Sequence, residues 1–399
     1  MIVVVGIGAG GWDEIPVRHQ LLVREASVIL GGKRHLDLVP DVPGQRREPW
    51  PSPLRDGLPA LLDDLGGSGD LGGVVALASG DPLVSGIGTT LIELLGPENV
   101  RIEPAVSSVA LARARMGWPA ETCAVVSLVG RDVALVAREL APGRRILALS
   151  SDGSTPGRIA KLLVTAGFGA SPMTVLGDLG AEAESAQTAT ASTWVGESPR
   201  LNIVAIECVG TPLGGWVAGL PDDVFEHDGQ LTKRDLRASA LARLAPAPEQ
   251  HLWDVGAGAG SVGIEWMRAH PTCTTTAIEA NTERAARIAR NAARLGVPGL
   301  CVVEGRAPDA LAGLAGPDAI FIGGGATRPG VLDACLAALR PGGRIIVHGV
   351  TLETEQLLAR QHAERGGELT RISVESVDAI GTFRGWAPQR TVVQWALRT

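Results

Sequence analysis

Two apolar strands in this chain each run directly into a glycine-rich turn, and these turns constrain the fold more than any other feature. The first is MIVVVGIGAGG at the N-terminus, where Gly6, Gly8 and Gly11 satisfy the spacing G-x-G-x-x-G. The second is HLWDVGAGAGSVGIE, where Asp254 opens the pattern D-x-G-x-G-x-G. A strand, a glycine turn and a helix in succession are typical of nucleotide-binding α/β folds, because glycine lets a ligand approach the backbone. The sequence therefore raises the question of two nucleotide sites in one chain.

The bulk properties narrow the class of protein. A chain of 399 residues exceeds one ordinary core, so two or three domains are expected. A net charge of −7 argues against nucleic-acid binding as the main role. The five cysteines are dispersed without CxxC spacing, which fits a reducing cytosol and gives no metal site. No stretch reaches the roughly 18 apolar residues of a membrane helix, and no signal peptide is evident. We therefore expect a cytoplasmic protein that binds no membrane, nucleic acid or metal.

Strand-like and helix-like segments alternate along the chain in two series, which predicts parallel sheets in α/β domains. Strands of the first series are predicted at 2–6, 27–31, 74–79, 100–104, 124–129, 146–151, 173–179 and 201–207. Those of the second series are predicted at 251–256, 274–280, 300–305, 318–325, 342–350, 369–379 and 390–398. A Gly- and Pro-rich stretch without periodicity separates the series. We assign an N-terminal domain to 1–208, a linker to 209–224 and a C-terminal domain to 225–399.

The second glycine turn is followed, in order, by the other features of an adenosine site. Its glycines and the helix that begins after them favour an anionic group such as a carboxylate. Glu279 ends the next strand, where a carboxylate can accept both hydroxyls of a ribose. The loop after the third strand lies where an adenine would rest. The predicted cofactor contacts of this half are Asp254, Gly256, Ala257, Gly258, Ala259, Gly260, Glu279, Arg306 and Ala307.

This order resembles the class I S-adenosylmethionine (SAM) methyltransferases, with a Rossmann-like sheet, over residues 231–399. G-x-G-x-x-G also occurs within the turn, so a nicotinamide cofactor is the alternative, but the preceding Asp and the hairpin-like tail favour SAM. The segment HDGQLTKRDLR is similar to the entry helix of the decarboxylating precorrin methyltransferases, which implies that Thr232 lies beside SAM. Basic side chains would then bind the carboxylates of the substrate, or alternatively form a solvated helix face. The candidates are Lys233, Arg234, Arg237 and, after the fourth strand, Arg328.

The first glycine turn lacks the context of a dinucleotide site. Such a site needs an acidic residue at the end of the second strand. Here that strand ends in glycines followed by Lys33, Arg34 and His35, which leave only NADP as an alternative. The fingerprint at the N-terminus therefore does not predict a nicotinamide site.

Other motifs in the first half resemble the class III tetrapyrrole methyltransferases, in the branch that methylates carbon 5 of precorrins. They include Ser79-Gly80-Asp81-Pro82 and Ser107-Ser108, although each alone is also a common turn or helix cap. The resemblance covers nearly all of 1–208 and implies two αβα halves with SAM in the cleft between them. It implies that SAM is held by Gly80, Asp81, Ile87, Ser107 and Ser108, and that Gly8 and Gly10 line the tetrapyrrole side.

Together the two resemblances imply a bifunctional enzyme of cobalamin biosynthesis with two SAM sites per chain. It would methylate a precorrin at carbons 5 and 15 and remove carbon dioxide from the ring C acetate, converting precorrin-6B to precorrin-8X. Members of both families self-associate, so we expect a homo-oligomer. The alternatives are a SAM methyltransferase for another substrate and a non-catalytic SAM- or tetrapyrrole-binding protein.

No general base is fixed by the spacing of the residues. The sulfonium methyl is electrophilic without activation, so orientation can supply much of the acceleration. The candidates for proton transfer are Glu103, Asp132, His227 and His348. Of these, His348 is interpreted as a hydrogen-bonded polar group rather than a proton carrier.

Overall fold

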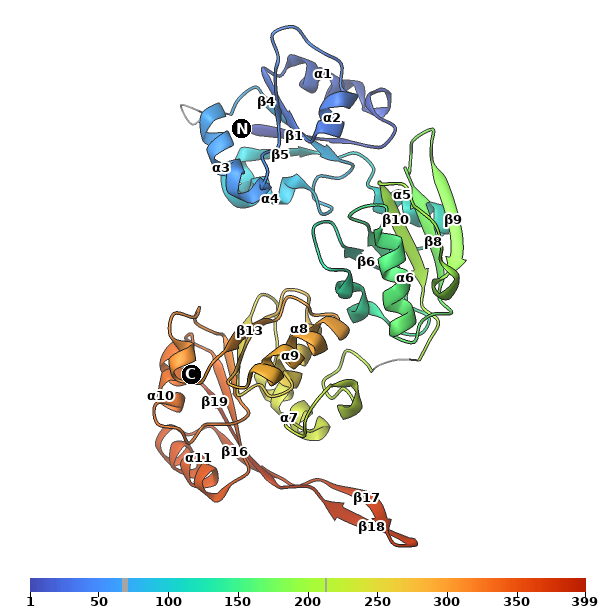
Figure 1. Ribbon diagram of the computed structural model, residues 1–399. Helices are drawn as coiled ribbons and strands as arrows, with labels where there is room; N and C mark the ends of the chain where they lie inside the picture. The colour runs from blue at the N-terminus through green and yellow to red at the C-terminus, as the bar shows by residue number, and fades with distance from the viewer. Residues whose placement is uncertain (67–70, 212–213) are drawn as a thin grey trace. The chain divides into compact units, whose positions relative to one another are not determined.

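The computed structural model describes residues 1–66, 71–211 and 214–399 (Figure 1). Two compact units divide the chain, and they consist of Met1–Val133 with Gly143–Gly210 and of Ala134–Pro142 with Thr211–Thr399. Residues 134–142, which the sequence analysis assigned to the first domain, thus group with the second unit. Pro212 and Leu213 of the predicted linker lie outside the described residues. Within the described ranges, no helix has the length and apolar character needed to cross a membrane.

The first unit contains two five-stranded sheets. The first sheet is parallel, in the order β3-β2-β4-β1-β5, and comprises β1 (Ile2–Ile7), β2 (Val28–Gly31), β3 (Arg46–Pro49), β4 (Val74–Ser79) and β5 (Val100–Glu103). Its helices are α1 (Val17–Glu25), α2 (Lys33–Leu38), α3 (Leu54–Leu65) and α4 (Ile87–Leu95). The interiors of β1 and β4 are buried apolar runs, as expected where helices cover both faces of a parallel sheet.

The second sheet of this unit is mixed, in the order β6-β7-β10-β8-β9. It comprises β6 (Cys123–Ser127), β7 (Arg145–Leu149), β8 (Pro172–Gly177), β9 (Ser185–Thr190) and β10 (Asn202–Glu207), with helices α5 (Ser108–Met116) and α6 (Thr155–Thr165). Every strand predicted for the first half is present. Strands β3 and β9 were not predicted, because both are polar strands at the edges of their sheets and have no apolar run.

A seven-stranded sheet forms the second unit, in the order β13-β12-β11-β14-β15-β19-β16. Its strands are β11 (His251–Val255), β12 (Thr274–Glu279), β13 (Cys301–Glu304), β14 (Ala319–Ile322), β15 (Arg344–Gly349), β16 (Glu368–Ile372) and β19 (Val392–Arg398). Strands β11 to β15 are parallel, whereas β19 and β16 are antiparallel to their neighbours. The strand order reverses beside β11, and ligands of such sheets bind at the carboxyl ends of the strands there.

Helices cover both faces of this sheet. One face packs against α7 (Arg234–Leu244), α8 (Ser261–Ala269) and α9 (Thr282–Arg294) in a cluster around Trp266. The other packs against α10 (Val331–Ala338) and α11 (Leu352–Arg365) in a cluster around Trp395. These observations confirm the predicted class, a Rossmann-like C-terminal domain after an N-terminal domain with two αβα halves.

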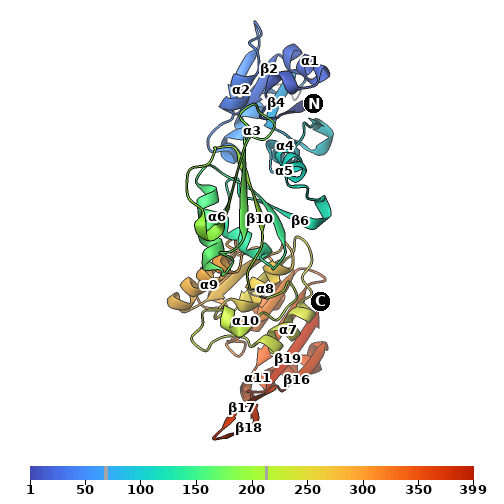
Figure 2. The same cartoon turned by 90° about the vertical axis from the view of Figure 1, so that its right-hand side faces the viewer.

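A separate hairpin, β17 (Glu375–Ile380) and β18 (Phe383–Pro388), extends away from the sheet of the second unit (Figures 1 and 2). The sequence predicts one strand over 369–379, but the chain forms β16 and β17 there instead. The large apolar side chains of the hairpin are 55% to 78% exposed, namely Val377, Ile380, Phe383 and Trp386.

The glycine at position 6 is required by packing rather than by a nucleotide. A Cβ atom at Gly6 would lie 1.9 Å from the carbonyl oxygen of Gly80, whose N–H donates to Ile7 O at 2.9 Å. A Cβ atom at Gly8 would meet no heavy atom closer than 4.0 Å. We therefore expect Gly6→Ala to destabilise the first unit by about 1–3 kcal/mol, the usual cost of overpacking. Urea unfolding measures this, with Gly8→Ala as the matched control, and equal effects of the two substitutions would contradict the packing explanation.

Candidate cofactor and substrate sites

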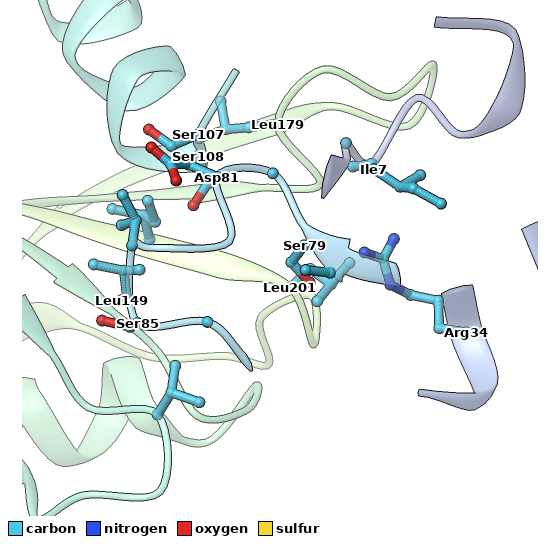
Figure 3. Close-up of a pocket in the computed structure, with 18 of the residues that line it drawn as sticks. Ile7, Arg34, Ser79, Asp81, Ser85, Ser107, Ser108, Leu149, Leu179 and Leu201 are labelled. Carbon is cyan, nitrogen blue, oxygen red and sulfur yellow. The ribbon is translucent and has the colours of Figure 1, made fainter. Parts of the chain in front are cut away.

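A cavity of about 450 Å³ in the first unit is lined by residues of both sheets (Figure 3). Five predicted cofactor residues all line it, namely Gly80, Asp81, Ile87, Ser107 and Ser108. Of the two glycines predicted on the substrate side, Gly8 lines the cavity and Gly10 does not. The structure thus brings together motifs that lie far apart in the sequence.

Backbone turns hold the predicted cofactor residues in place. Gly80 has φ 50°, and its carbonyl accepts from Ala105 N at 3.1 Å. Asp81 Oδ1 accepts from Leu83 N at 2.9 Å, and Ser107 Oγ caps α5 by accepting from Ala110 N at 3.1 Å. Figure 3 shows Asp81 close to both serines. The turn and cap interpretations are therefore correct, and these same turns bring the N-terminus of α5, which favours anionic groups, to the cavity.

A cationic group lies on another side of this cavity. Arg34 extends from α2 on the side of the cavity away from the serines (Figure 3). Its Nη2 lies 3.2 Å from His35 Nε2. That ring nitrogen lies 3.0 Å from Ser79 Oγ. Burial, with a smaller contribution from Arg34, lowers the pKa of His35 to about 4, so the ring is neutral near pH 7. Burial also lowers the pKa of Arg34, and Asp178 opposes this effect. From the sequence, these basic residues indicate only the NADP alternative.

A larger cavity, of about 990 Å³, lies in the second unit at the carboxyl ends of its parallel strands. The predicted cofactor residues that line it are Thr232, Gly256, Ala257, Gly258, Glu279, Arg306 and Ala307. Glu279 is 6% exposed, its Oε2 accepts from Gly258 N, and its Oε1 accepts from Asn281 N, both at 2.9 Å. The carboxylate is thus fixed beside the glycine turn, where ribose hydroxyls can use its remaining lone pairs.

Three predicted cofactor contacts are buried and do not line this cavity, namely Asp254, Ala259 and Gly260. Asp254 Oδ2 accepts from Gly263 N at 3.0 Å, and its Oδ1 has no hydrogen-bond partner among the described residues. Burial raises the pKa of Asp254 to about 7. A Cβ atom at Gly260 would lie 2.7 Å from Ile288 Cγ2, so this glycine allows the turn to pack on α9. These three residues lie behind the turn and shape it, whereas the sequence predicted that they contact the cofactor directly.

The predicted substrate-binding cations separate into two groups. Lys233 and Arg328 line the second cavity, whereas Arg234 is exposed and does not. Arg237 is 0% exposed, and its guanidinium donates to Glu265 Oε1 at 2.5 Å and to the carbonyl oxygens of Leu220 and Thr232. The structure therefore contradicts the predicted role of Arg237 as a substrate ligand.

Of the four candidates for proton transfer, one lines a cavity and three do not line either of the two cavities described. Glu103 bonds to His19 Nε2 at 2.9 Å and to Arg101, and it lines neither cavity. Asp132 is exposed, and His227 accepts from Gly229 N at 3.0 Å; neither residue lines either of these two cavities. His348 does line the second cavity and is 8% exposed.

Several residues that line the second cavity were not predicted from the sequence, namely Asn281, Arg284, Gln389 and Arg390. Arg284 Nε donates to Asp228 Oδ2 at 2.8 Å. Gln389 and Arg390 immediately follow the hairpin, and no local pattern signals that this part of the tail returns to the carboxyl ends of the strands.

Comparison with known proteins gives matches over both units. Residues 1–194 match the family of tetrapyrrole (corrin/porphyrin) methylases, and residues 223–399 match the precorrin methyltransferase domain. A Sinorhizobium protein named precorrin-6Y C(5,15)-methyltransferase (decarboxylating) is 44% identical over 99% of this chain and 95% of its own.

Two shorter proteins of Salmonella typhimurium also match. One, named cobalt-precorrin-6B C(15)-methyltransferase (decarboxylating), is 31% identical over 41% of this chain and 85% of its own. The other, named cobalt-precorrin-7 C(5)-methyltransferase, is 34% identical over 46% of this chain and 88% of its own.

The burial of Arg237 predicts a stability defect rather than a binding defect. Arg237→Ala would leave Glu265, whose side chain is 3% exposed, without its cationic partner, which typically costs about 3–5 kcal/mol. Lys233→Ala is the control, because the Lys233 side chain is 43% exposed and its ion pair with Asp222 spans 3.6 Å. Guanidinium unfolding followed by fluorescence measures both. Normal stability of Arg237→Ala together with weakened substrate binding would restore the role predicted from the sequence.

Proposed function

Because the chain belongs to the family of the precorrin-6Y C5,15-methyltransferases (decarboxylating), we propose that it converts precorrin-6B to precorrin-8X. It methylates the macrocycle at carbons 5 and 15 with SAM and removes carbon dioxide from the ring C acetate. One observation carries the two-site form of this proposal: each unit has its own cavity, and most of the cofactor residues predicted for its fold line that cavity.

The two units divide the work. The first methylates carbon 5, and the second methylates carbon 15 and decarboxylates the acetate. This assignment is supported by the two Salmonella relatives, which carry names for a C(5) and a C(15) reaction on separate chains. It also agrees with the family models that match each part of the chain.

In the first unit, Gly80, Asp81 and the serines at the start of α5 hold SAM, which supplies an electrophilic methyl group. Arg34, across the cavity, binds a carboxylate of the macrocycle as a charge-assisted hydrogen-bond donor. With the cofactor and the macrocycle held at opposite sides, alignment of the ring carbon with the methyl group supplies the acceleration.

In the second unit, Glu279 accepts the ribose hydroxyls, and Thr232 lies beside the cofactor. Lys233, Arg328 and Arg390 bind the peripheral carboxylates that are retained in the product. Arg237 is left out of this set, since its donors are used inside the unit.

Titration calorimetry of the full chain with S-adenosylhomocysteine tests the two sites. We expect two binding events in the wild type, loss of the second-unit event in Glu279→Ala, and loss of the first-unit event in Asp81→Ala. Glu283→Ala is the control, because the Glu283 side chain is 82% exposed on α9. Product masses after incubation with precorrin-6B and SAM should show that Glu279→Ala cannot decarboxylate. A single binding event in the wild type would overturn the two-site proposal.

The expected self-association also remains a proposal, and the hairpin is the region that favours it. A two-stranded ribbon alone is marginally stable in water, and this one exposes apolar side chains on both faces. A second copy of the same hairpin would cover one of these faces, either Ile380 with Phe383 or Val377 with Trp386. We expect a Phe383→Ser, Trp386→Ser variant to sediment as a smaller species than the wild type, while an unchanged sedimentation coefficient would exclude the hairpin as the contact.

A further inference from the structure

His348 and Gln394 form a buried polar pair in the wall of the second cavity. They lie directly opposite each other on the antiparallel strands β15 and β19. His348 lines the cavity, and its ring packs edge-on against Phe321 with centroids 5.0 Å apart. Burial lowers the pKa of His348 to about 4, with the bond to Gln394 acting in the opposite direction. The imidazole is therefore neutral near pH 7.

The hydrogen-bond network assigns the tautomer of this ring. Arg243 has only donors, so the amide oxygen of Gln394 faces it and accepts from Nη1 and Nε, each at 3.2 Å. The amide nitrogen then donates to His348 Nε2 at 2.9 Å. Because Nε2 is an acceptor, the ring proton of the neutral His348 lies on Nδ1.

Nδ1 is the atom left for a ligand. It has no hydrogen-bond partner among the described residues. It is also not a fully buried atom, so solvent or a ligand can reach it. The other polar groups of this cavity include the cations Lys233, Arg328 and Arg390. The cavity thus offers several charged donors and, at His348, a neutral donor whose proton is held on Nδ1 by the bond between Nε2 and Gln394.

Decarboxylation makes a neutral donor useful. The bond between the acetate methylene and its carboxylate breaks, the electron pair stays on the methylene carbon and spreads into the macrocycle, and carbon dioxide leaves. A proton from water then completes the methyl group. An ion pair with the reacting carboxylate would stabilise the ground state more than the transition state, in which the negative charge has moved away. A neutral N–H can orient the carboxylate with less of this penalty.

We propose that His348, held as the Nδ1–H tautomer by Gln394, positions the acetate carboxylate that is lost. His348 contacts the substrate, and Gln394 is a positioning residue that Arg243 orients in turn. This inference rests on the proposed function of the second unit.

The tautomer can be inverted with a single substitution. In Gln394→Glu the carboxylate still accepts from Arg243 and now also accepts a hydrogen bond from His348. The ring proton therefore moves to Nε2, and Nδ1 keeps a lone pair toward the substrate. Nitrogen NMR of the histidine-labelled full chain should show protonated Nδ1 in the wild type and protonated Nε2 in the variant. The rate of decarboxylation should fall about ten- to hundredfold, the value of one hydrogen bond to a charged group. Affinity for S-adenosylhomocysteine should not change.

Two further variants and a control complete the test. His348→Asn keeps a neutral donor and should retain most decarboxylation, whereas His348→Phe should lose it. Gln361→Glu makes the same chemical change on α11 and should behave as the wild type. Protonated Nε2 in the wild type, or normal decarboxylation by His348→Phe, would overturn this inference. A wild-type chain that neither methylates nor decarboxylates precorrin-6B would instead overturn the proposed function.

Discussion

The site of the second unit depends on the contact between the glycine turn after β11 and the end of the neighbouring strand β12. Glu279, at the end of β12, accepts the N–H of Gly258 in the turn after β11. The same turn is held by Ile278, whose carbonyl accepts from Gly256 N at 3.0 Å and from Ala257 N at 3.2 Å. Because β11 and β12 are parallel neighbours, these bonds fix the turn at the edge of the sheet where the strand order reverses. The position of the cavity follows from that constraint.

The two glycine turns look alike in the sequence but serve different physical purposes. In the first unit Gly6 is needed because Gly80 O approaches its Cα, so the glycine brings two loops together. In the second unit Gly256, Gly258 and Gly260 have φ between 60° and 76°, a backbone conformation that residues other than glycine rarely adopt. A fingerprint of glycines therefore identifies a tight backbone, and the neighbouring strand ends decide what that backbone binds.

How far the sequence predicts a residue's place depends on the range of the contacts involved. Glu279 and the Gly80-Asp81 turn could be located, since each follows directly from the end of a strand. Arg237 was misassigned, although its spacing from Ala240, Leu241 and Leu244 places it on the buried face of α7. Gln394 could not have been paired with His348, because β19 returns to β15 only after α11, β16 and the hairpin. Polar edge strands such as β9 were missed for want of an apolar pattern.

Each cavity contains one histidine, His35 or His348, and burial lowers the pKa of both to about 4. Between mildly acidic and mildly alkaline conditions neither ring gains or loses a proton, so cationic attraction in both pockets comes from arginine and lysine alone. The imidazole rings in both cavities therefore stay neutral near neutral pH, and their charge does not change the attraction of either cavity for a polyanionic macrocycle.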